Sequence, residues 1–109
     1  MKEIETVYKK QKEYGYIKSI NIFRSINGEE CSQYSIKISL VNFPCWDAME
    51  HFDIIFEGIS NLKIGDIDNL FRIFIQIDSI VEYQHENAKY MVKECENDLF
   101  SFNCMEIKV

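Results

Sequence analysis

The chain has 109 residues, of which 47% are hydrophobic, 14% aromatic and 28% charged. This composition is typical of a single globular domain and argues against a disordered chain. The net charge is −6 and the isoelectric point about 4.9. An acidic protein repels phosphate backbones, so we expect no nucleic-acid binding. No apolar run approaches the ~20 residues that a membrane helix needs, so we expect no membrane insertion.

The first residues lack the apolar segment of a secretory signal, which predicts a cytoplasmic protein with reduced cysteines. The spacing of the four cysteines does not indicate a zinc site. We expect neither a metal nor another cofactor. Cys95 and Cys104 could face each other across a hairpin, and two neighbouring buried thiols are then expected.

Residues 1–13 predict a short amphipathic helix. Ile4, Val7 and Tyr8 recur at helical spacing, and lysine and glutamate residues fill the opposite side. Gly15 is a plausible stop signal. A helix of this length is marginal alone, so its apolar stripe is expected to dock on the rest of the protein.

Residues 16–43 predict a long hairpin, because the Asn27-Gly28 turn signal lies between two runs of alternating apolar residues. The register should place all apolar side chains on one face. A three-residue loop that ends at Gly28 satisfies this condition and pairs Ile20 with Tyr34.

Further alternating runs predict strands over 52–64, 71–77, 88–92 and 100–109. Gly58 should bend the first of these strands, and a bulge near Cys104-Met105 should restore the inward phase of the last one. An extension of the 71–77 strand to Tyr83 is expected after a break at Asp78-Ser79. The aromatic residues alternate at strand spacing and are expected in the core; the set is Phe23, Tyr34, Phe43, Phe52, Phe56, Phe71, Phe74, Phe100 and Phe102.

The fold predicted from these runs is mainly β. It is an antiparallel meander that curves into a half-barrel or a two-layer sandwich, with the N-terminal helix covering an edge or an open end. The whole chain, residues 1–109, should form one domain, with a helix over 1–13 and antiparallel β structure over 16–109.

No pattern in the chain compels a chemistry. His51 stands beside Glu50 without a second histidine nearby, and His85 lies in a polar turn. The four glycines form no phosphate-binding loop. We therefore expect no enzymatic activity. A small-ligand binder with a β-cup is a remaining alternative.

Acidic residues gather between positions 47 and 68, where Lys63 is their only basic counterpart. If they share a face, that face carries a negative field that would attract a basic protein. An ordinary solvated edge is the alternative. With the only tryptophan, the candidate partner-binding set is Trp46, Asp47, Glu50, Asp53, Glu57, Asp66 and Asp68.

Three stretches carry a resemblance: Tyr-Gly-Tyr-Ile-Lys-Ser-Ile-Asn-Ile, Phe-Glu-Gly-Ile-Ser-Asn-Leu-Lys-Ile and Leu-Phe-Ser-Phe-Asn-Cys-Met-Glu-Ile-Lys-Val. Over residues 14–109 the chain resembles small bacterial immunity proteins of polymorphic-toxin and contact-dependent inhibition systems. The resemblance implies a non-catalytic cytoplasmic protein that binds and neutralises a cognate toxin, which is often basic. It transfers no binding residue. A small interaction or assembly module of unrelated role is the alternative, and both a monomer and a homodimer remain open.

Overall fold

The computed structural model describes residues 2–24, 26–27, 30–31, 33–42, 51–66, 72–80 and 89–109. Within these ranges one short helix precedes a series of strands. The elements are α1 (Lys2–Lys10), β1 (Tyr16–Phe23), β2 (Ile26–Asn27), β3 (Glu30–Cys31), β4 (Ser35–Val41), β5 (Phe52–Glu57), β6 (Ser60–Ile64), β7 (Ile75–Ser79), β8 (Tyr90–Glu94), β9 (Phe100–Cys104) and β10 (Glu106–Lys108).

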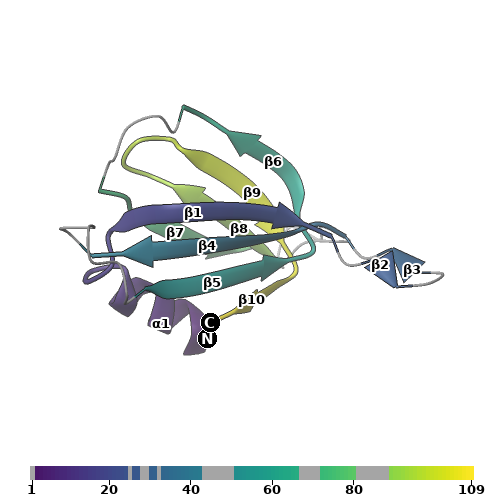
Figure 1. Ribbon diagram of the computed structural model, residues 1–109, viewed down its shortest axis with the longest axis horizontal. Helices are drawn as coiled ribbons and strands as arrows, with labels where there is room; N and C mark the ends of the chain where they lie inside the picture. Colours follow the sequence, from purple (N-terminus) through teal and green to yellow (C-terminus); the bar gives the residue numbers. More distant parts are fainter. Residues whose placement is uncertain are drawn as a thin grey trace.

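The strands form two four-stranded antiparallel sheets that lie one over the other (Figure 1). The first sheet has the order β1-β4-β5-β10, and the second has the order β6-β9-β8-β7. The predicted fold class is confirmed: the protein is mainly β, with a short N-terminal helix, and the sheets do not close into a barrel. In the described part of the chain no helix has the length and apolarity required to cross a membrane.

Two long segments of chain belong to both sheets. β5 pairs with β10 in the first sheet, and their continuations, β6 and β9, pair in the second. The chain changes sheets at Gly58, whose φ of 70° is accessible to glycine at little cost, and at Met105, whose N–H donates to the Glu57 carbonyl at 2.8 Å. These are the predicted bend and bulge.

The core lies between the two sheets and contains side chains from both. Phe56 of β5 meets Phe102 of β9 edge to face, with ring centroids 5.0 Å apart. Ile107 is buried together with Phe102, so the chain does regain its inward phase after Met105. Val7 extends the same core into α1.

Helix α1 supplies hydrogen bonds to the free edge of β7, the last strand of the second sheet. The Tyr8 hydroxyl accepts from the Ile77 N–H at 2.9 Å and lies 3.1 Å from the Ile77 carbonyl, to which it donates. The Gln11 amide forms a similar pair of bonds with Ile75. Tyr8 of the helix and Gln11, which follows the helix, thus take the place of a neighbouring strand, which confirms that this N-terminal element covers an edge. The helix itself ends at Lys10, earlier than predicted, and a turn follows it.

The predicted register of the first hairpin is wrong. Ile20 lies opposite Ile38, not Tyr34, and the hairpin continues into the short β2–β3 pair, where Asn27 lies opposite Glu30. This pair projects beyond both sheets (Figure 1). The partners of residues 19–23 move by an even number of residues, so these side chains keep the predicted face, whereas the pairing shifts by one residue between Ile17 and Ser19. Alternation alone could not exclude the observed pairing. The predicted position of Gly28 lies outside the described residues.

Two details of the later strands also differ from the prediction. β7 begins at Ile75 and runs without a break through Asp78 and Ser79. The segment before it is bonded elsewhere: the Ile73 N–H donates to the Gly15 carbonyl, and the Phe74 N–H donates to a carboxylate. The predicted strand start at Phe71 and the predicted extension past residue 80 lie outside the described residues.

A buried carboxylate organises the turn between β8 and β9. Glu94 is 1% exposed, and each of its oxygens accepts hydrogen bonds from the main chain. Oε1 accepts from the N–H groups of Asn97 and Leu99, and Oε2 accepts from those of Glu96 and Phe74. Four main-chain donors thus stabilise a charge that would otherwise be costly to bury.

Candidate functional site

Three of the seven candidate partner-binding residues can be placed in the structure: Asp53, Glu57 and Asp66. The other four lie outside the described residues; they are Trp46, Asp47, Glu50 and Asp68. Asp53 and Glu57 lie on the outward face of β5, on the side opposite the buried Ile54 and Phe56. Asp66 follows β6 in the second sheet. The three described acids therefore do not form one compact acidic face.

Asp53 is the centre of a small polar cluster on the first sheet. The Ser39 hydroxyl donates to Oδ1 at 2.6 Å, and Oδ2 lies 3.2 Å from His51 Nε2 and 3.6 Å from Lys37 Nζ. Burial raises the pKa of Asp53, but the Ser39 hydrogen bond and the charges of His51 and Lys37 outweigh it, and the net pKa is lowered. Much of the Asp53 charge is thus compensated within the protein.

Glu57 forms the second ion pair of this face. Its Oε1 lies 2.7 Å from Lys108 Nζ, and this contact, with the nearby charge of Glu106, raises the pKa of Lys108. Glu57 also borders a hollow of about 330 Å³ at the end of the sheet.

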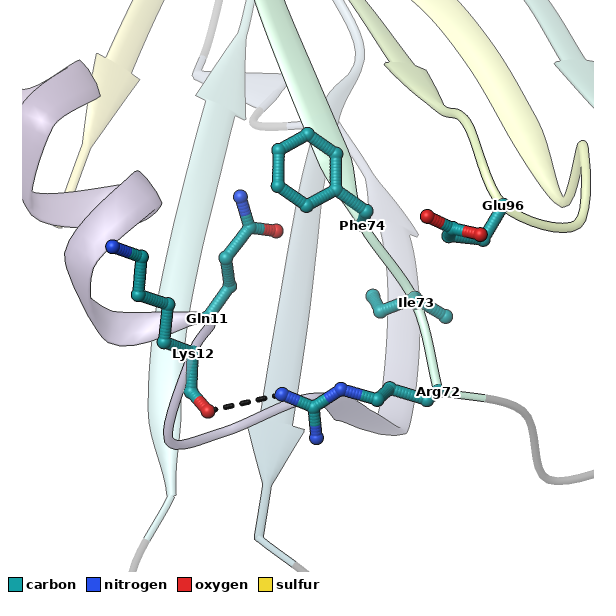
Figure 2. Close-up of a pocket in the computed structure, with 6 residues that line it drawn as sticks. All are labelled: Gln11, Lys12, Arg72, Ile73, Phe74 and Glu96. Atoms are coloured by element: carbon teal, nitrogen blue, oxygen red, sulfur yellow. Dashed lines mark hydrogen bonds between the residues drawn. The ribbon is translucent and has the colours of Figure 1, made fainter.

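A second hollow, of about 300 Å³, lies where the chain leaves α1 and passes β7 (Figure 2). One Arg72 nitrogen donates to the Lys12 carbonyl at 3.1 Å, and Phe74 and Glu96 lie on the other sides. Gln11 also lines this hollow, but its amide is already bonded to Ile75. The polar groups of this hollow mainly hold the N-terminal segment against the sheet. The side chains of Arg72 and Lys12 are the cations in its lining that could bind an anion.

The outward face of the second sheet is a shallow groove of about 640 Å³. Its lining combines the exposed apolar side chains of Leu62 and Met91 with the cations of Lys63 and Lys93. This face therefore differs in charge from the Asp53 and Glu57 side of the first sheet.

Three aromatic side chains that were expected in the core are exposed: Phe23, Tyr34 and Phe74. Position parity could have identified Phe23, because it lies one residue from Ile22 and hence on the face opposite Ile20 and Ile22. Phe74 likewise lies out of phase with Ile73 and Ile75. The exposed Tyr34 forms a cation–π contact: Arg24 Cζ lies 4.1 Å from the centroid of the Tyr34 ring.

The two cysteines whose side chains the structure describes, Cys95 and Cys104, do not face each other. Tyr90, not Cys95, lies opposite Cys104. Burial raises the pKa of Cys104 to about 12. Burial also raises the pKa of Cys95, although that thiol is exposed and Lys93 opposes the shift. In the described part of the chain no three histidine, cysteine or carboxylate side chains gather as a metal site would require.

A family model described as Immunity protein PIM8 matches residues 1–109. The chain has no significant match among curated proteins or among solved structures. The family match thus covers both sheets, helix α1 and every candidate residue discussed above.

Proposed function

Because the chain belongs to the Immunity protein PIM8 family, we propose that it binds a cognate toxin in the bacterial cytoplasm and neutralises it by direct contact, without catalysis. The observation that carries this proposal is the family match over the whole of residues 1–109. A two-sheet scaffold with exposed aromatic side chains at its surface suits such a role, because aromatic residues dominate the binding energy of many protein interfaces.

We further propose that the toxin is basic. The net charge of −6 would favour encounter with a basic protein and would raise the association rate at low ionic strength. The charge is uneven, since residues 1–24 carry a net charge of +3 and residues 25–109 a net charge of −9. The acidic part includes most of both sheets.

The experiment uses the toxin domain encoded by the reading frame next to this gene. The domain is expressed in a bacterial host with and without the full chain, and growth is followed. The purified proteins are then mixed and analysed by size-exclusion chromatography with light scattering. The proposal expects growth arrest that the chain relieves, together with a stable complex. Relief without any complex would reject neutralisation by binding, and neither relief nor complex would reject this toxin as the partner.

A homodimeric assembly module is the second candidate, and strand β6 favours it. β6 is an edge strand, and its Leu62 and Ile64 side chains are exposed. Exposed apolar edges can pair with a second copy. Light scattering of the chain alone distinguishes the two: a mass near 13.0 kDa indicates a monomer, and twice that mass supports the dimer. A Leu62→Lys variant that restores the monomer would locate the contact at β6.

A further inference from the structure

Four residues form one row across the outward face of the first sheet. Phe23 of β1 lies opposite Ser35 of β4, Ser35 lies opposite Glu57 of β5, and Glu57 lies opposite Glu106 of β10. Neighbouring strands are about 5 Å apart, so the row presents an aromatic ring, a hydroxyl and two carboxylates in close succession. All four line the hollow of about 330 Å³, with Gln33, Gly58 and Met105.

Ser35 lies in the middle of the row, on β4. The residue as a whole is 8% exposed, and it lines the hollow. Because Ser35 lies between Phe23 and Glu57 in the row, its oxygen faces the hollow and can accept a hydrogen bond from an incoming donor.

The two carboxylates of the row are an unfavourable pair. Like charges directly opposite each other on neighbouring strands destabilise a sheet. Lys108 forms an ion pair with Glu57, and its charge also acts on Glu106, which is exposed. One lysine thus faces two carboxylates. The hollow therefore keeps an excess negative charge beside an exposed apolar ring.

We infer that this row is the anchor site for an arginine side chain of the partner protein, an inference that rests on the proposed function. A guanidinium group is planar and carries five N–H donors, so it can bond the Glu106 and Glu57 carboxylates and the Ser35 hydroxyl while lying against the Phe23 ring. A lysine ammonium offers neither the flat face nor the fork of donors. Rings and guanidinium groups are also the commonest anchors at interfaces.

The other hollows suit this ligand less well. The hollow of Figure 2 contains the cations Lys12 and Arg72 and one acid, Glu96, so an incoming guanidinium would meet like charges. The groove on the second sheet carries Lys63 and Lys93. Charge thus selects the row on the first sheet as the cation site.

The first test requires no toxin. The ¹⁵N-labelled full chain is titrated with N-acetyl-arginine amide, and N-acetyl-citrulline amide and N-acetyl-lysine amide serve as controls at the same ionic strength. We expect saturable amide shifts at Phe23, Ser35, Glu57 and Glu106, with a Kd of about 1 mM for the arginine compound. The citrulline compound should not bind, because it has the same shape without the charge. Equal shifts with all three compounds, or shifts centred on another face, would overturn the inference.

The second test uses the toxin domain and two pairs of matched variants. Phe23 and Phe74 are both 41% exposed, so Phe23→Ala is compared with Phe74→Ala. Glu106→Gln is compared with Glu96→Gln, since both glutamates are exposed. Phe23→Ala and Glu106→Gln should each raise the Kd for the toxin about tenfold or more. The two control variants should change that Kd by less than about twofold.

The outcomes separate the two proposals. If the toxin binds but the row variants behave as their controls do, the row is rejected while the proposed function stands. If the toxin does not bind, the proposed function fails for that toxin, and the arginine titration alone decides the row.

Discussion

The side-chain amide of Gln11 forms two hydrogen bonds with the main chain of one residue, Ile75. Nε2 donates to the Ile75 carbonyl at 3.0 Å, and the Ile75 N–H donates to Oε1 at 2.7 Å. Gln11 is 3% exposed, so solvent cannot replace these bonds. The amide thereby reproduces the pairing that a neighbouring strand would offer to the edge of β7.

Gln11→Ala should therefore destabilise the whole protein. The substitution leaves two buried main-chain groups without partners, and each such group typically costs about 1–3 kcal/mol. Urea unfolding followed by circular dichroism measures the loss. Lys10→Ala, at the exposed last residue of α1 and next to Gln11, is the control and should change the stability by less than about 0.5 kcal/mol. Equal losses in the two variants would show that the Gln11 bonds contribute little.

Glu94→Gln should loosen the turn between β8 and β9. An amide nitrogen donates and cannot accept, so one side of the group loses its two main-chain partners, with an expected cost of about 1–3 kcal/mol. Hydrogen exchange should accelerate at the amides that now bond Glu94, which are those of Phe74, Glu96, Asn97 and Leu99. Glu96→Gln alters a nearby exposed carboxylate and should leave these amides protected.

Gly58→Ala tests the point where the chain changes sheets. A Cβ atom at Gly58 would lie 2.6 Å from Met105 Cγ and 2.8 Å from Met105 Cβ, and the φ of 70° disfavours any other residue. We expect a loss of about 1–3 kcal/mol in the free energy of unfolding.

Gly15→Ala is the matched control for this variant. There the nearest atoms belong to the flexible end of the Arg72 side chain, which can move aside, so the cost should be smaller. A larger loss at Gly15 than at Gly58 would contradict the role given to the bend.

Cys104 makes stability fall at alkaline pH. Burial raises its pKa from 9.0 to about 12 in the folded protein. Between these values the unfolded chain releases the thiol proton and the folded chain keeps it, so unfolding is favoured as pH rises. Its contribution is fully present below pH 9.0 and is lost as pH rises toward about 12.

The measurement is the unfolding free energy of the wild type and of Cys104→Ala at several pH values between 8 and 11. The unfolding free energy of the wild type should fall more steeply with pH than that of Cys104→Ala, and the two slopes should differ by up to about 1 kcal/mol per pH unit. Parallel pH profiles would show that the Cys104 thiol is not shielded. As an independent check, alkylation at pH 9 followed by peptide mapping should label Cys95 and spare Cys104 in the native protein.

Alternation along the chain was sufficient to predict the fold class, because an apolar period of two has only one common structural meaning. It also predicted the inward phase of Ile107 after Met105 and the docking of Val7. It could not fix the register of the first hairpin, since a shift by an even number of residues leaves Ile20 and Ile36 on the same face. Nor could it foresee that Phe74 donates to Glu94, because that bond depends on tertiary structure.

The candidate site was less predictable than the fold. The nearness in sequence of the acids between positions 47 and 68 suggested a common acidic face. In the structure, Asp53 lies in the first sheet and Asp66 follows a strand of the second sheet. Asp53 also forms ion pairs with Lys37 and His51. The Phe23 row is invisible in the sequence, because its four members come from four strands whose order follows only from the pairing. Charge patterns along a chain do not report which strands become neighbours.

The most direct test of the account is the stoichiometry of toxin neutralisation. The toxin domain from the neighbouring reading frame is titrated with the full chain, and its activity and the heat of binding are recorded in the same samples. Direct neutralisation predicts that activity falls in proportion to complex formation and disappears when every toxin molecule is bound. Activity that persists in the saturated complex, or that falls at amounts of the chain far below stoichiometric, would contradict it.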